Sequence, residues 1–181
     1  KIMFNIKDHL IVKDNFFDKK TYNEILKEIS TSNFKNRSTT INEKRDSRYA
    51  GHQIYFNVPL DFNHFAVENV RKKLFLEYEL DLSSEEHAYF LSGKHNKPTP
   101  HCDYPMHVNC IVYLKGETII NSGTGFYDVK NNQYDLNRHI GFKENTAIIF
   151  DSNIFHASLQ FNDGAKPRYM MANFFKYRNK K

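Results

Sequence analysis

The chain has 181 residues, 40% of them hydrophobic and 15% aromatic, with only seven glycines and five prolines. This composition is that of one compact domain with a substantial core, and it excludes a disordered or low-complexity chain. The formal net charge of +5 would suit an acidic partner. The basic residues are spread along the chain, however, so solvated surfaces explain them better than a nucleic-acid site does.

The sequence also bears on location. No apolar run approaches the ~20 residues of a membrane span, and the first residues show no signal-peptide pattern. The two cysteines, Cys102 and Cys110, are expected to be reduced thiols and not a disulfide. We therefore expect a cytoplasmic protein without a membrane partner; the sequence does not indicate its oligomeric state.

The first part of the chain, to about residue 85, is predicted to hold helices and loops. Its elements are, in order, a strand at Leu10–Val12, a helix that begins at Lys19 after the cap Asp18 and ends near Ser32–Asn33, a strand at Gln53–Val58 and a helix from about Asn63 to Glu77. Helical spacing predicts core-facing stripes made of Tyr22, Ile25, Leu26 and Ile29 in the first helix and of Phe65, Val70, Leu74, Phe75 and Tyr78 in the second.

The segment from Phe34 to Gly51 is polar and irregular, which indicates either a lid over a site or an ordinary mobile loop. The residues that we expect to touch a substrate there are Arg45, Arg48, Tyr49 and His52. With Arg37 included, three arginines face only two acidic residues in this segment. A positive lid of this kind would favour a substrate with an acidic group.

From Glu86 onward, short runs rich in β-branched and aromatic residues alternate with turn signals, which is typical of a β-sandwich or barrel. The predicted strands are His87–Leu91, His101–Asp103, His107–Lys115, Thr118–Ile120, Thr124–Tyr127, His139–Gly141, Thr146–Phe150, Phe155–Phe161 and Arg168–Tyr177. About eight antiparallel strands after two helices predict a mainly β jelly roll with its core at about residues 86–177.

Three residues of this β-rich part could bind a metal ion. In an extended strand, His101 and Asp103 point to the same face, because side chains alternate. Together with His156 they would form a facial triad of two histidines and one carboxylate, a set that holds Fe(II) and leaves three positions open. Arg168 opens the last strand, where its planar guanidinium could hold a carboxylate through two parallel hydrogen bonds.

In these residues the sequence resembles the Fe(II)/2-oxoglutarate-dependent dioxygenases, on their prolyl-hydroxylase-like side. The similarity runs from about Tyr89 to Phe175. Its motifs are, in order, HCD, VNCIVYLKG, NSGTGFYD, FKENTAIIFDSNIFHAS and RYMMANFF. The resemblance implies a single oxygenase domain with the double-stranded β-helix, or cupin-like jelly roll, and with Fe(II), 2-oxoglutarate and O2 as cofactor and co-substrates.

The resemblance also assigns further residues to the co-substrate. Asn109 and Tyr113 share one face of their strand and would look into the barrel, where they would contact 2-oxoglutarate together with Arg168. Tyr89 resembles the family tyrosine that bonds the co-substrate carboxylate, although the spacing also allows Phe90 in that place. The histidines His95, His107 and His139 are expected to be surface or supporting groups.

The implied activity is oxidation of a substrate coupled to decarboxylation of 2-oxoglutarate to succinate and CO2. Family halogenases replace the triad carboxylate by a small residue; Asp103 is present, so hydroxylation is expected. The substrate would be an amino-acid side chain, in a peptide or free, or a small metabolite. The alternative is a metal-binding cupin-type jelly roll with other or no catalytic activity, which would keep the triad but would not need Arg168.

Overall fold

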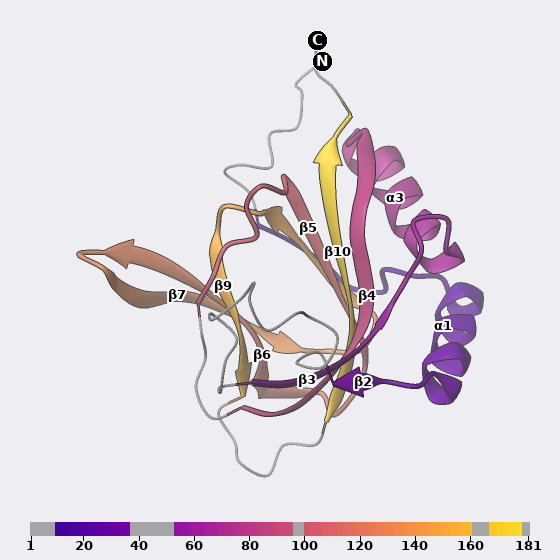
Figure 1. Ribbon diagram of the computed structural model, residues 1–181, viewed down its shortest axis with the longest axis horizontal. Helices are drawn as coiled ribbons and strands as arrows, with labels where there is room; N and C mark the ends of the chain where they lie inside the picture. The colour runs from indigo at the N-terminus through magenta and orange to yellow at the C-terminus, as the bar shows by residue number, and fades with distance from the viewer. Residues whose placement is uncertain (1–9, 37–52, 96–99, 161–166, 179–181) are drawn as a thin grey trace.

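The computed structural model describes residues 10–36, 53–95, 100–160 and 167–178. Two antiparallel sheets face each other, and two helices cover the outer face of the larger sheet (Figure 1). The helices are α1 (Lys19–Thr31) and α3 (Phe65–Tyr78). Neither is long and apolar enough to cross a membrane, and no other described helix is.

The strands pair in a fixed order in each sheet. The larger sheet runs β1 (Ile11–Lys13), β8 (Thr146–Asp151), β5 (Val108–Lys115), β10 (Arg168–Tyr177), β4 (Leu82–His95), β3 (Gln53–Pro59) and β2 (Lys35–Asn36). The smaller sheet runs β7 (Gln133–Phe142), β6 (Ile119–Lys130) and β9 (Phe155–Gln160). The prediction of a mainly β fold with two helices is thereby confirmed, and this arrangement is consistent with a jelly roll.

The first helix forms as its sequence predicts. The Asp18 carboxylate accepts hydrogen bonds from the backbone N–H groups of Lys20 and Thr21, both at 3.0 Å, which satisfies donors left open at a helix start. Ile25 and Ile29 are buried against the larger sheet. The cap and the stripe were both readable locally, because each depends only on residues within a few positions.

The second helix buries the predicted stripe except for Phe75: Val70 and Leu74 are buried, and Phe65 and Tyr78 pack partly buried against the same core. Its buried residues are Ala66, Val67, Val70 and Leu74, whereas Phe75 is 55% exposed. The prediction that Phe75 faces the core is therefore wrong. A helix turns by 100° per residue, so once Val70 and Leu74 set the buried face, Phe75 turns towards solvent.

Alternation along the central strands sorts their side chains between two cores. In β5, Val108, Cys110, Val112 and Leu114 pack with the helices. The intervening Ile111 and Tyr113 instead pack between the two sheets, as do Met170 and Ala172 of β10. The face between the sheets is the one that receives Arg168, since it shares its parity with Met170.

Several predicted strands have different limits. His101–Asp103 is not a strand: His101 makes one isolated bridge to His156, and a loop follows. Thr118–Ile120 and Thr124–Tyr127 are parts of the single strand β6, which is irregular after Ile119. β7 is much longer than the predicted His139–Gly141; its outer residues, in which Tyr134 and Leu136 alternate with polar side chains, are exposed. The predicted lid residues Arg45, Arg48, Tyr49 and His52 lie outside the described residues.

Candidate metal centre

His101, Asp103 and His156 come together, although only His156 lies on a regular strand. Their ligand atoms all lie within 4.8 Å of one another. The Nε2 atom of His156 is 3.2 Å from Oδ2 of Asp103, and Nε2 of His101 is 3.9 Å from Oδ1. Among the described residues this is the one group of three such side chains close enough to share an ion.

Backbone hydrogen bonds fix the two histidines beside each other. The N–H of His101 donates to the carbonyl of His156 at 3.0 Å, and the N–H of His156 donates back at 2.9 Å. The two imidazole rings are 4.6 Å apart between centroids. A single bridge thus replaces the predicted strand and still places both rings on one side.

The tautomer of His156 follows from its own surroundings. Nδ1 lies 3.0 Å from the carbonyl oxygen of Ile154, which can only accept a hydrogen bond. Nδ1 therefore carries a proton, which leaves Nε2, the nitrogen that faces Asp103, as the candidate metal-ligating atom. The rings of Phe126 and Phe150 pack beside the imidazole and hold its plane.

The carboxylate of Asp103 is oriented by a chain of hydrogen bonds. The amide of Asn109 donates to Oδ2 of Asp103 at 2.5 Å. The hydroxyl of Ser152 donates in turn to the Asn109 side-chain oxygen at 2.7 Å. The prediction that Asn109 contacts the co-substrate stays a prediction. In the structure its amide donates to Asp103, a candidate metal ligand, because the start of β5 lies next to the loop that carries Asp103. Ser152 lies in the motif FKENTAIIFDSNIFHAS, but no role was predicted for it.

Electrostatics keep Asp103 ionised. Burial by itself would raise the pKa of this carboxyl group. The hydrogen bond and charge of His156, the charge of His101 and the Asn109 amide outweigh burial and hold the pKa below its usual range. Two imidazoles and one carboxylate on a single side form a donor set that fits Fe(II).

Arg168 lies between the sheets, as its position in the last strand predicts, and is 2% exposed. Its Nη1 donates to the carbonyl of Leu159 and its Nη2 to the carbonyl of Gly123, both at 2.9 Å. The same two nitrogens also donate to the hydroxyls of Ser122 and Ser158. Ser122 lies in the motif NSGTGFYD and Ser158 ends FKENTAIIFDSNIFHAS, but no role was predicted for either. The alternation of β6 and β9 could have indicated that they face inwards.

Tyr113 also faces the space between the sheets. Its hydroxyl donates to the carbonyl of Ile140 at 3.2 Å and lies 2.7 Å from the Thr124 hydroxyl. Burial raises the pKa of Tyr113 to about 12, although the nearby charge of Arg168 acts in the opposite direction. Tyr113 and Arg168 therefore belong to one neighbourhood, which we call the Arg168 cluster and define as Arg168, Tyr113, Ser122, Thr124 and Ser158.

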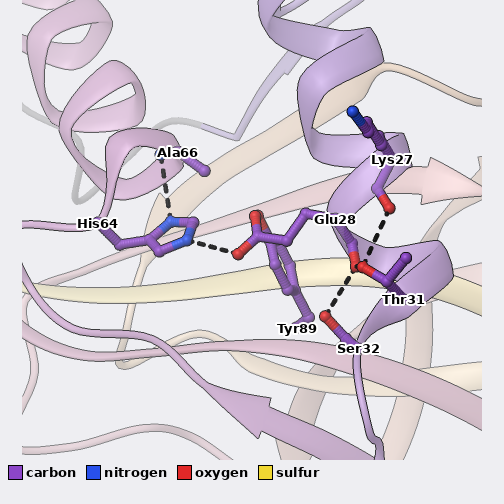
Figure 2. A network of polar contacts seen from close by, with 7 residues as sticks. All are labelled: Lys27, Glu28, Thr31, Ser32, His64, Ala66 and Tyr89. Atoms are coloured by element: carbon purple, nitrogen blue, oxygen red, sulfur yellow. Dashed lines mark hydrogen bonds and ion pairs between the residues drawn. The ribbon is translucent and has the colours of Figure 1, made fainter.

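Tyr89 lies on the opposite face of the larger sheet. Its hydroxyl donates to Oε2 of Glu28 in α1 at 2.8 Å, and Oε1 of Glu28 is 2.8 Å from Nε2 of His64 (Figure 2). This placement contradicts the prediction that Tyr89 contacts the co-substrate. Phe90, the alternative, packs between the sheets with Tyr113, because neighbouring residues of a strand point to opposite faces.

Two other histidines, His107 and His139, do not join the site, and the side chain of His95 lies outside the described residues. His107 accepts a hydrogen bond at Nδ1 from the backbone N–H of Tyr177 at 3.0 Å and stacks on that ring. Burial lowers the pKa of His139, and the charge of Arg168 lowers it further. Neither belongs to the group of described side chains that could hold a metal.

Comparisons with known proteins give a fold but no sequence relative: no family model matches the chain, and no curated protein matches it. A prolyl-4-hydroxylase from Pseudomonas putida has a TM-score of 0.55 at 12% identity, over 94% of this chain and 93% of its own. The alpha-ketoglutarate-dependent epimerase SnoN from nogalamycin biosynthesis has a TM-score of 0.60 at 14% identity, over 96% and 81%. HygX from Streptomyces hygroscopicus, with nickel, 2-oxoglutarate and hygromycin B bound, has a TM-score of 0.59 at 11% identity, over 93% and 82%.

These neighbours are a prolyl hydroxylase and enzymes that use iron or 2-oxoglutarate, which is the group that the sequence resembles. SnoN has also been solved with Fe3+ and alpha-ketoglutarate, so the neighbours hold the metal and co-substrate that the resemblance implies. At 11–14% identity, the likeness establishes the shared fold.

Proposed function

We propose that this chain is an Fe(II)- and 2-oxoglutarate-dependent oxygenase that hydroxylates an amino-acid side chain or a small metabolite and releases succinate and CO2. One observation carries the proposal. His156 and Ser158 lie two residues apart on the same face of β9, and Ser158 accepts a hydrogen bond from Arg168. The Cα atoms of His156, a candidate metal ligand, and of Ser158, which contacts the buried guanidinium, are therefore roughly 7 Å apart along one strand, a spacing that suits the two ends of a five-carbon diacid.

The contacts of His101, Asp103 and His156 suit these residues to bind Fe(II). His156 presents Nε2, Asp103 is anionic, and Asn109 orients the carboxylate. When bound, Fe(II) would supply the activation of O2 and the oxidation of the 2-oxo acid. The residues of the chain hold the ligand atoms in place, and the rings of Phe126 and Phe150 keep water from the back of His156.

The Arg168 cluster fits the distal carboxylate of 2-oxoglutarate. Two of the acceptors on Arg168 are serine hydroxyls, which can rotate and donate instead. A carboxylate entering beside the guanidinium would take over its N–H groups while Ser122 and Ser158 turn to donate to the same carboxylate. A metal-binding jelly roll without 2-oxoglutarate chemistry would not need this buried cation.

The proposed reaction type and location come from the sequence. The neighbours include an epimerase as well as a hydroxylase, so the fold alone does not choose the outcome. Hydroxylation is proposed because Asp103 keeps the carboxylate that family halogenases lack. The cytoplasmic location remains a prediction from the sequence.

Calorimetry with Zn(II) as a redox-silent metal tests the proposed function. The Zn(II)-loaded protein is expected to bind 2-oxoglutarate, and the chelator-treated protein to bind it at least tenfold more weakly. Arg71→Gln removes one half-buried guanidinium from α3 and serves as the control for Arg168→Lys, which keeps the charge but loses the planar fork. Equal 2-oxoglutarate affinity in both variants, or none in the loaded wild type, would refute the proposal.

A further inference from the structure

A row of four side chains crosses the smaller sheet at the level of the metal ligands. His101 pairs with His156 through the isolated bridge, His156 pairs with Phe126 across β9 and β6, and Phe126 pairs with Arg138 across β6 and β7. Directly paired residues of antiparallel strands place their side chains on the same face. The ring of Phe126 lies 6.4 Å from that of His156 between centroids, which confirms the shared face.

Arg138 is therefore on the metal face of the smaller sheet, two strand spacings, or roughly 10 Å, from His156. Unlike Arg168 it is exposed. No hydrogen bond or ion pair of its guanidinium is found with any residue in the described ranges. It is a cation with open hydrogen-bonding capacity at the rim of the candidate metal centre.

The hairpin that carries Arg138 extends past the sheet at this rim. β9 pairs with β6 only as far as Tyr127, whereas β6 and β7 continue to pair as far as Lys130 and Gln133. Figure 1 shows β7 projecting from the body of the molecule. A substrate that reaches the metal from this side must pass along the face of the hairpin that carries Arg138.

The charges on this face restrict the kind of substrate. Alternation from Phe126 places Asp128 and Lys130 on the metal side, and pairing adds Asp135. The Asp128 carboxylate accepts a hydrogen bond from the Asn137 amide at 2.8 Å. Two acidic residues balance Lys130 and Arg138, so a polyanion such as a nucleic acid gains little here. A single carboxylate can instead take two parallel hydrogen bonds from one guanidinium.

We propose that Arg138 binds a carboxylate of the substrate, which is an amino acid or a peptide, and so determines which carbon faces the metal. This inference rests on the proposed function and specifies the substrate class of the same site. The sequence predicted that arginines of the lid would bind an acidic group, but they lie outside the described residues. We assign that role instead to Arg138, whose position relative to His156 is defined.

The test compares acid and amide forms of otherwise identical probes. The probes are the free L-amino acids against their carboxamides, and two blocked pentapeptide libraries that carry Asp or Asn at the central position. Each is titrated into protein loaded with Zn(II) and 2-oxoglutarate, and dissociation constants are taken from ¹H–¹⁵N chemical shifts. The amino-acid and peptide arms distinguish the two sources of the carboxylate.

The wild type is expected to bind the acid form of at least one probe about tenfold more tightly than its amide, which corresponds to one charge-assisted contact of ~1.4 kcal/mol. Arg138→Gln should abolish that preference and leave the amide affinity unchanged. Lys130→Gln removes the same charge further along the same hairpin and should keep the preference, as a matched control.

Two sets of outcomes are distinguishable. If Arg138→Gln keeps the acid preference, if acid and amide bind the wild type alike, or if no probe binds the loaded wild type, the assignment of Arg138 is wrong while the proposed function stands. If the Zn(II)-loaded wild type does not bind 2-oxoglutarate in the first place, the proposed function fails instead.

Discussion

The larger sheet has one face covered by helices and one face turned towards the smaller sheet, and the two differ in chemistry. The helix-covered face packs an extended apolar core, including Ile25, Leu74, Val112 and Leu114. The opposite face packs a smaller apolar cluster and borders the Arg168 cluster and the candidate metal ligands. The same strands β4, β5 and β10 supply both faces through alternate residues.

This difference indicates a division between stability and chemistry. Buried polar groups are costly unless they are hydrogen-bonded. The face that carries Arg168 and Asn109 therefore has partners for them built into β6, β9 and the loop at Ser152. The helix-covered face needs few such partners, because its residues are largely apolar. Substitutions on the two faces should therefore separate into effects on ligand binding and effects on unfolding.

The largest effect is expected from His156→Ala on the metal face. Loss of a supporting partner alone typically costs 10–100-fold in metal affinity, so loss of a ligand should cost more than about 100-fold. Fe(II) affinity and 2-oxoglutarate turnover should both be lost, while the unfolding midpoint of the apo-protein stays close to that of the wild type. His107→Ala removes a surface imidazole and should change neither. Undiminished Fe(II) affinity in His156→Ala would remove this histidine from the ligand set.

On the helix-covered face, Leu114→Ala should lower the free energy of unfolding by about 2–5 kcal/mol, since the side chain is 0% exposed and the truncation leaves a cavity. Urea unfolding measures this change. The folded variant should keep the wild-type affinity for 2-oxoglutarate. Leu76→Ala, at a residue that is 65% exposed, should change stability by less than about 0.5 kcal/mol. A co-substrate defect in Leu114→Ala would show that the two faces are coupled.

His87 gives the helix-covered face a dependence on pH. Burial lowers its pKa from 6.5 to about 4, against the Asn173 hydrogen bond and the charge of Glu85, which raise it. The folded pKa lies below the unfolded one, so the unfolded chain binds more protons between these values. Stability from this group is complete above pH 6.5 and is lost as the pH falls towards 4, by up to about 3 kcal/mol.

The measurement for His87 is the free energy of urea unfolding between pH 7 and pH 4. His87→Asn keeps an N–H donor for Asn173 but does not titrate, so its stability should fall less steeply over this interval. Parallel curves for the wild type and the variant would show that other groups account for the acid sensitivity.

A smaller effect on the metal face is expected from Asn109→Ala. Because Asn109 orients the carboxylate of Asp103, its loss should weaken Fe(II) binding about 10–100-fold. At saturating metal, the affinity for 2-oxoglutarate should stay within about twofold. The opposite result, normal metal affinity with weakened 2-oxoglutarate binding, would support the prediction that Asn109 contacts 2-oxoglutarate.

The smallest effect is expected from Tyr89→Phe. The substitution removes one hydrogen bond to Glu28, which keeps its contact with His64. The cost should be about 0.5–1.5 kcal/mol in unfolding, without a change in the dissociation constant of 2-oxoglutarate. A several-fold loss of co-substrate affinity would mean that Tyr89 acts on the other face after all.

Features that depend on neighbours in the chain were determined by the sequence itself. Asp18 caps α1, Ile25 and Ile29 form its buried stripe, and β10 spans the predicted Arg168–Tyr177. The grouping of His101, Asp103 and His156 was predicted from their residue types and order, and the structure brings their ligand atoms within 4.8 Å of one another. Alternation placed Asn109 and Tyr113 on one face of their strand, whereas the resemblance placed Arg168 with them.

Only the tertiary structure decided which face of each strand meets which partner. Alternation separates Tyr89 from Phe90 but does not say which of them points to the helices. That choice follows from the pairing of β4 with β10, whose residues are distant in the chain. The role of Asn109 depends in the same way on Ser152 and Asp103, and that of Arg138 on three successive strand pairings. Such contacts depend on register between distant strands, which the hydrophobic pattern of a single strand does not encode.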